Sequence, residues 1–186
     1  MKERKSTLIT LLVLVGTLLL VGFIVYYIQQ RAVLSERDTE SSQTLVASEE
    51  TPYTDLSGDT FTFDEFRGKV RVVNTWASWC PFCVAELKDF EVLAAEYAQK
   101  EVAVIAVNRK ETKEKAQAFL NTVGSFEHVH FAIDLTDAFY KSVGGFSMPE
   151  TVFYDAKGNI FLHKRGFMDL EEMRLHTEAA LAASDN

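Results

Sequence analysis

Cys80 and Cys83 are the only cysteines of the chain, and they lie two residues apart in the segment W-C-P-F-C at residues 79–83. Two thiols at this spacing can reach disulfide distance across one helical turn. They follow an apolar, β-rich run at residues 68–76, and a helical pattern begins at Pro81. A helix N-terminus stabilises a thiolate through its free N–H groups and its dipole. The pattern predicts a redox-active dithiol, with Cys80 as the exposed nucleophile and Cys83 as the deeper, resolving thiol.

Three other roles are open to a cysteine pair: a metal knuckle, a static disulfide, or two core side chains. A zinc site needs two more ligands in a paired spacing. His128 and His130 are separated by one residue only, and no other pair is present. A static disulfide that closes so small a loop restricts the unfolded chain little. The residues therefore favour redox chemistry without a metal or another cofactor.

The elements that must position the pair follow from hydrophobic periodicity. Strands alternate with helices, which favours parallel βαβ units, and a hairpin with a last amphipathic helix follows. The expected fold is a three-layer α/β fold with a central mixed sheet and helices on both faces. We expect strands at 68–76, 102–107 and 129–133, helices from 81, at 111–123 and at 137–143, a hairpin at 151–154 and 159–164, and a helix at 170–183.

The charge is unevenly spread along the 186 residues. The formal net charge is −8, with Lys2, Arg4, Lys5 and Arg31 against Glu3 in residues 1–31. A basic leader therefore precedes an acidic body, which lacks the basic face that a nucleic-acid-binding protein needs.

Residues 7–28 carry no charge and are mostly Leu, Val and Ile. A helix of this length spans roughly 33 Å, enough to cross a hydrocarbon core of about 30 Å. The positive charges before it predict a cytosolic N-terminus, and hence an extracytoplasmic location for the rest of the chain. Residues 1–31 are thus interpreted as a cytosolic tip and a transmembrane signal-anchor. Cleavage as a signal peptide is the alternative, but the residues after the span make a poor cleavage site.

Residues 32–52 are rich in Ser, Thr and Glu and poor in aromatic residues. Such a composition cannot form a core and is typical of a flexible, solvated tether. The globular domain is expected to occupy residues 53–186.

Four segments carry a resemblance to a known family: D-L-S-G-D-T-F at 55–61, G-K-V at 68–70, V-N-T-W-A-S-W-C-P-F-C at 73–83 and M-P-E-T-V-F-Y-D at 148–155. Over residues 53–181 the chain resembles the thioredoxin superfamily. Within it, the chain is similar to the membrane-anchored, extracytoplasmic TlpA/ResA/CcmG-like thiol-disulfide oxidoreductases. The resemblance implies a thioredoxin-like fold.

The resemblance also implies roles for individual residues. Cys80 matches the attacking cysteine, Cys83 the resolving one, and Pro149 the proline that is cis and faces the disulfide. Glu86 matches a glutamate that accepts the proton of the second thiol, while Asn74 replaces the buried aspartate of ordinary thioredoxins. Glu86 shares a helix face with Cys83, where burial would raise its pKa. A solvated first-turn glutamate is the alternative.

Several apolar residues near the pair are candidates for substrate binding. We expect Trp79, Phe82, Met148 and Pro149 to form an apolar rim that receives the substrate backbone, with Pro81 among the substrate-binding residues.

The direction of electron flow depends on charges near the thiols. Glu86 and Glu150 would disfavour a thiolate, and Lys88 is the nearest base in sequence. A less stable thiolate gives a more reducing pair. We therefore expect a reductase of disulfides in exported proteins, and a disulfide-introducing oxidase is the alternative.

Two further alternatives on related folds fit less well. A copper-binding chaperone needs a C-x-x-x-C spacing, which the pair at 80 and 83 does not have. A peroxidase of the peroxiredoxin type needs Thr-x-x-Cys, and Thr75 lies five residues before Cys80.

The resemblance implies two kinds of partner. Extracytoplasmic protein disulfides, with apocytochrome c as one precedent, would be the substrates. A membrane electron donor of the CcdA/DsbD type would reduce the enzyme again.

Overall fold

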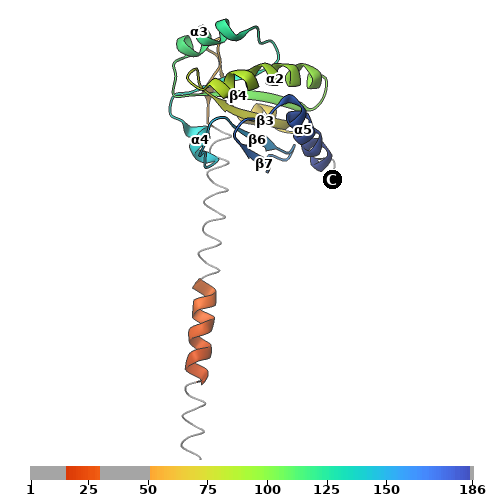
Figure 1. Cartoon of the computed structure of the whole chain (residues 1–186). Coiled ribbons are helices and arrows are strands. Elements are labelled where there is room, and N and C mark those ends of the chain that lie inside the picture. The colour runs from red at the N-terminus through yellow and green to blue at the C-terminus, as the bar shows by residue number, and fades with distance from the viewer. Residues whose placement is uncertain (1–15, 30–50, 185–186) are drawn as a thin grey trace, which may run out of the picture. The chain divides into compact units, whose positions relative to one another are not determined.

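The computed structural model describes residues 16–29 and 51–184 (Figure 1). The chain divides into two separate units, residues 1–44 and 45–186. In the first unit, residues 16–29 form a helix whose side chains are all exposed.

The predicted membrane span at residues 7–28 falls only partly on this helix. Residues 7–15 lie outside the described residues, as do residues 32–50 of the predicted tether. None of the helices in the described ranges combines the length and the apolarity that crossing a bilayer requires.

The second unit is built on a seven-stranded mixed sheet with the order β2-β1-β5-β4-β3-β6-β7. Strands β3, β4 and β5 are parallel, and β6 and β7 continue the sheet as antiparallel neighbours. The strands are β1 Tyr53–Thr54, β2 Thr60–Phe61, β3 Val70–Trp76, β4 Val102–Arg109, β5 His130–Asp134, β6 Glu150–Tyr154 and β7 Ile160–Arg165.

Helices cover both faces of the sheet because the central strands are apolar on both sides. Val72 belongs to a buried cluster that includes residues of α2, α3 and α5, whereas its neighbour Val73 belongs to a second cluster with Phe63 and with Phe139 of α4. Alternation along a strand requires this division. The helices are η1 Phe63–Phe66, α2 Pro81–Tyr97, α3 Lys113–Val123, α4 Ala138–Ser142 and α5 Leu170–Ser184 (Figure 1).

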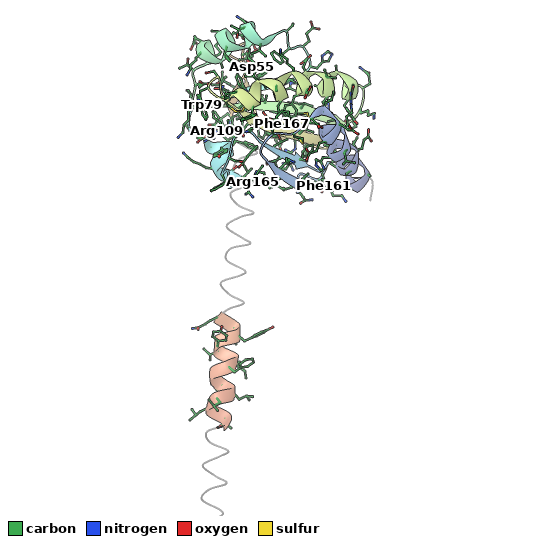
Figure 2. All side chains as sticks on the ribbon, viewed as in Figure 1. Asp55, Trp79, Arg109, Phe161, Arg165 and Phe167 are labelled. Atoms are coloured by element: carbon green, nitrogen blue, oxygen red, sulfur yellow. A yellow bond between two sulfur atoms is a disulfide. The ribbon has the colours of Figure 1, made fainter. Side chains whose placement is uncertain are left out.

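One edge of the sheet gathers the loops that matter for chemistry. The parallel strands β3, β4 and β5 end there, β6 begins there and β7 ends there. We call it the carboxyl edge, formed by residues 77–80, 110–112, 135–137, 146–149 and 166–169. Figure 2 shows Trp79 and Arg109 at the same end of the domain, while Phe161 lies at the other end of β7 from Arg165.

Hydrophobic periodicity did not predict the first part of the domain. Strands β1 and β2 pair with each other, β1 pairs with β5, and the 3-10 helix η1 follows. Each of these strands has two residues, too few to show a period. Their position depends on Tyr53, which is buried and stacks on Phe63.

Candidate functional site

A disulfide joins Cys80 and Cys83 at the start of α2. Their Cα atoms are 5.3 Å apart. Cys80 is the N-cap of the helix, and its Sγ accepts a hydrogen bond from the backbone N–H of Cys83 at 3.2 Å. Pro81 occupies the first helical turn, where its missing N–H costs nothing. The strand-to-helix junction therefore holds the pair at the carboxyl edge.

Both cysteines are covered. Cys83 is fully buried, as expected for the deeper cysteine, but Cys80 is only 4% exposed. The expectation of an exposed Cys80 is therefore wrong for this oxidised form. The reason is packing, because Cys80 is bonded to Cys83 and belongs to the same core cluster as Trp76 and Leu87.

Two aromatic side chains beside the disulfide are exposed instead. Trp79 is 60% and Phe82 66% exposed, and Pro81 is also exposed. These residues flank the cysteines in the chain and present apolar surface next to them.

The loop before β6 lies at the same carboxyl edge of the sheet. The Met148–Pro149 peptide bond is cis, which agrees with what the family resemblance implies. The Oγ1 of Thr75 donates to the Met148 Sδ at 3.6 Å and to the backbone carbonyl of Glu150 at 3.2 Å. Met148 is partly buried against the core cluster that contains both cysteines, whereas Pro149 is buried.

Glu86 lies one turn after Cys83 on α2 and is fully buried. Its Oε1 accepts a hydrogen bond from the backbone N–H of Met168 at 2.7 Å, and its Oε2 accepts from the Asn74 side chain at 3.2 Å. Burial raises the pKa of Glu86 to about 8, although these two hydrogen bonds oppose the shift. The carboxyl group can therefore exchange a proton near neutral pH.

Asn74 connects Glu86 to the strand that follows the cis-proline. Its Nδ2 donates to Glu86 and also to the Oγ1 of Thr151 at 3.0 Å. Its Oδ1 is buried and accepts no hydrogen bond from any of the residues that the structure describes. The Glu86 carboxyl group is thus fixed between α2, β3 and β6.

Periodicity assigned Glu111 to the first turn of a helix, and this is wrong. Helix α3 begins at Lys113, because Thr112 is the N-cap and its Oγ1 accepts from the N–H of Lys115 at 3.3 Å. Glu111 is left outside the helix and its side chain is buried. The N-cap preference of threonine was the sequence signal that could have shown this.

The carboxylate of Glu111 holds the loop that carries the disulfide. It accepts hydrogen bonds from the backbone N–H of Ser78 at 2.8 Å, the Ser78 Oγ at 2.6 Å and the Asn108 side chain at 2.9 Å. Lys115 Nζ lies 2.7 Å away. Burial opposes ionisation, but the hydrogen bonds from Lys115, Ser78 and Asn108 lower the pKa of this carboxyl to about 2. It stays charged at every physiological pH.

A third buried carboxylate, Glu150, follows the cis-proline. Its Oε1 accepts from the backbone N–H groups of Phe146 and Ser147 at 2.7 and 2.6 Å, and its Oε2 lies 2.9 Å from His163 Nε2. Burial alone would raise its pKa, but the N–H donors of Ser147 and Phe146, together with His163, outweigh burial and lower it. Glu150 therefore fastens the loop before the proline.

The described residues offer no ligand set for a metal ion. Within residues 16–29 and 51–184, no group of three or more His, Cys, Asp and Glu side chains is arranged to hold one. The site brings together one disulfide and one buried carboxyl group whose pKa is raised to about 8.

Comparison with protein families gives one match that covers most of the chain. Residues 40–181 match the Redoxin family. This range includes every side chain of the site described above.

Individual relatives agree with that match. The chain is 38% identical over 109 residues to the thiol:disulfide interchange protein DsbE of Allochromatium vinosum, covering 57% of this chain and 56% of the relative. The alignment thus spans about half the length of that relative. The thiol-disulfide oxidoreductase ResA of Geobacillus thermodenitrificans is 26% identical, with 96% of this chain and 98% of the relative covered.

Solved structures share the fold. The structure of MTB dsbF in its mixed oxidized and reduced forms is 26% identical, with a TM-score of 0.63 over 72% of this chain and 97% of that chain. StoA from Bacillus subtilis is 21% identical, with a TM-score of 0.58 over 68% and 95% of the two chains. The expected thioredoxin-like α/β fold with a mixed sheet is confirmed.

Proposed function

The chain belongs to the Redoxin family, and from that membership we propose that it is a thiol-disulfide oxidoreductase that reduces disulfides in exported proteins. The observation that carries the proposal is the Cys80–Cys83 disulfide at the N-terminus of α2, one turn before the buried Glu86. The names of the DsbE and ResA relatives support this activity.

The proposed reaction begins from the reduced dithiol. The Cys80 thiolate attacks one sulfur of the substrate disulfide. A Cys80–substrate S–S bond forms, the substrate S–S bond breaks, and the departing substrate thiolate takes a proton from water. The helix N-terminus assists by stabilising the Cys80 thiolate.

Glu86 acts in the second step. In its ionised form it takes the proton of the Cys83 thiol, directly or through a water molecule. The Cys83 thiolate attacks the Cys80 sulfur, the Cys80–Cys83 bond forms, and the mixed disulfide breaks. The released substrate thiolate takes up a proton, so two electrons and two protons have passed to the substrate.

Trapping the mixed disulfide tests this order of attack. A Cys83→Ser variant should accumulate a covalent complex with a disulfide-containing protein such as insulin, visible on a non-reducing gel and lost on reduction. Cys80→Ser is the matched control and should form none. A covalent complex through Cys83 in the Cys80→Ser variant would contradict the assignment of the attacking sulfur.

The reduction potential decides between reductase and oxidase. Glu86 lies one turn after Cys83, and its carboxyl group disfavours a thiolate there once it is ionised. Lys88, the nearest base in sequence, is exposed. We expect a potential nearer to about −270 mV than to about −120 mV, the thioredoxin and DsbA values. A potential near the DsbA value would instead support the oxidase.

The cellular setting is part of the same proposal. Residues 7–28 anchor the chain in the membrane with the N-terminus in the cytosol, and residues 32–52 tether the extracytoplasmic domain. A CcdA/DsbD-type donor returns two electrons to the disulfide, and tethering raises its effective concentration. Disulfides of extracytoplasmic proteins are the proposed substrate class, with apocytochrome c as one precedent. Protease added to intact cells or spheroplasts should digest residues 53–186, and protection of this domain would contradict the topology.

A further inference from the structure

Phe146 is the most exposed large hydrophobic side chain among the described residues, at 85%. It lies at the carboxyl edge, two residues before Met148. Met148 contacts the core cluster of the two cysteines and accepts a hydrogen bond from Thr75. An aromatic side chain is therefore presented to solvent at the carboxyl edge, on the loop that leads to the cis Met148–Pro149 peptide bond.

The backbone under this side chain is held by Glu150. The fully buried carboxylate accepts the N–H groups of both Phe146 and Ser147. It is itself fixed by His163, 2.9 Å away on β7. Hydrogen bonds to a charged acceptor are about twice as strong as neutral ones.

The same loop is also held by Tyr140 of α4. The hydroxyl of Tyr140 donates to the carbonyl of Ser147 at 2.9 Å, and the Gly145 N–H donates to the Tyr140 carbonyl at 2.8 Å. Gly145 lies directly against the Tyr140 ring. The ring also carries the Arg109 guanidinium, 3.3 Å from its centroid.

Arg109 is fixed in turn by a buried acid. Its Nε and Nη2 donate to the two carboxylate oxygens of Asp137 at 2.6 and 2.7 Å. This bidentate pair, the stacked ring and the Tyr140 hydroxyl form one connected support for the loop. The loop is therefore ordered by two sets of contacts, one around Glu150 and one around Tyr140, while the Phe146 side chain stays exposed.

Exposed apolar surface contributes nothing to folding, whereas an aromatic group on an ordered backbone binds with little further entropy cost. Rigid aromatic anchors are enriched among residues that dominate binding energy. Trp79 and Phe82 are exposed beside the same disulfide. A protein substrate must place one sulfur of its disulfide next to Cys80 in order to react.

We propose that Phe146 is a specificity-determining residue that packs against an apolar side chain next to the disulfide cysteine of a protein substrate. This inference rests on the proposed thiol-disulfide exchange and adds a preference among its substrates. Glu150 and Tyr140 act as positioning residues for Phe146.

Two synthetic peptides test the proposal, each with one internal disulfide and differing only in leucine or serine beside both cysteines. We expect the full-length protein to reduce the leucine peptide with a kcat/KM about tenfold higher than the serine peptide. In Phe146→Ser this preference should fall to about twofold or less. A parent protein without the preference, or a variant that keeps it, would overturn the proposal.

Phe161→Ser is the matched control. Phe161 is 41% exposed and lies at the opposite end of β7 from the site (Figure 2), so its replacement should leave the preference unchanged. An equal loss in Phe161→Ser would show a general effect of lost apolar surface and overturn the proposal.

Tyr140→Phe examines the support of the loop. It keeps the ring on Arg109 and removes the hydroxyl group, which donates to the Ser147 carbonyl and also interacts with the Arg109 side chain. We expect the leucine preference to fall about threefold, with an unchanged Cys80–Cys83 reduction potential. An unchanged leucine preference would show that Tyr140 does not position Phe146. If the parent reduced neither peptide, the proposed function itself would fail, which is a different outcome from reduction without preference.

Discussion

Glu86 and Glu111 lie in two regions that both contact the segment around the disulfide, and both are almost completely withdrawn from water. Their pKa values nevertheless move in opposite directions, to about 8 for Glu86 and about 2 for Glu111. Glu86 accepts one backbone N–H and one amide. Glu111 accepts a backbone N–H, a hydroxyl, an amide and an ammonium group.

The difference teaches that burial alone does not decide whether a carboxyl group is charged. The balance between the depth of burial and the number and charge of the donors decides it. Glu86 has few hydrogen-bond donors, so its carboxyl group can bind and release a proton. Glu111 has more donors and one of them is charged, so its carboxylate stays ionised and serves to position the loop. One region is thus suited to proton transfer and the other to positioning.

The largest expected effect is on turnover in Glu86→Gln. Glutamine has nearly the shape of a protonated glutamate but cannot accept a proton. We expect kcat/KM for insulin reduction to fall about 100-fold at pH 7. In the parent, activity should rise with pH through about 8 as Glu86 ionises, and this rise should vanish in the variant. An unchanged pH profile would exclude Glu86 as the proton acceptor.

The same substitution should have an opposite effect on stability. Because the pKa of Glu86 is raised in the fold, the native protein binds more protons than the unfolded chain between about pH 4.5 and 8, and stability falls as pH rises. Glu86→Gln removes this loss, so we expect it to be more stable than the parent by about 2–4 kcal/mol at pH 8. Near pH 4 the difference should disappear. Urea unfolding of the oxidised protein measures it.

Asn74 can accommodate this substitution. Its Oδ1 is buried without a hydrogen bond from the described residues, so a rotated Asn74 amide can offer this oxygen to the side-chain amide that Glu86→Gln introduces. The Met168 N–H keeps an oxygen acceptor in the variant. A Glu86→Gln protein that is less stable than the parent at pH 8 would therefore contradict the raised pKa.

Glu111→Gln should show the opposite pH dependence of stability. Its pKa is depressed in the fold, so its contribution to stability is present above about pH 4.5 and is lost as pH falls toward about 2. We expect the variant to unfold about 2 kcal/mol more easily at pH 7, and to approach the parent at the acid end. A loss of stability that is independent of pH would show that charge is not the origin of its effect.

The smallest effect is expected for Ser78→Ala. The variant removes the Oγ hydrogen bond to Glu111 but keeps the backbone N–H of residue 78 as a donor. We expect a loss of about 1 kcal/mol in unfolding free energy, measured by urea unfolding. A loss of unfolding free energy as large as that of Glu111→Gln would mean that the Ser78 hydroxyl group accounts for the whole stabilising effect of Glu111.

Much of the fold could be predicted from the sequence, because β3, β4 and α2 are long enough to show their period. The predicted strand at 68–76 begins at Val70, and the predicted helix begins at Pro81 as expected. The two-residue strands β1 and β2 could not be found in this way, because they are fixed by tertiary pairing rather than by a local pattern.

The site was predictable only in part. The spacing of Cys80 and Cys83 pointed to a dithiol, and the resemblance pointed to Glu86. The N-cap preference of Thr112 could have placed Glu111 outside α3, but no local signal predicts the contacts of Glu111 or the exposure of Phe146. The role of Glu111 depends on its hydrogen bond with the loop at Ser78, which is distant in sequence. Phe146 is distinguished only by its exposure in the folded protein.

The contact of Gly145 with Tyr140 has a consequence for sequence variation. The ring occupies the place where any side chain on residue 145 would have to lie. An alanine at 145 and a tyrosine at 140 are therefore mutually exclusive in this backbone. Over evolutionary divergence, we expect an aromatic residue at 140 and glycine at 145 to be inherited, and to be lost, as a single trait.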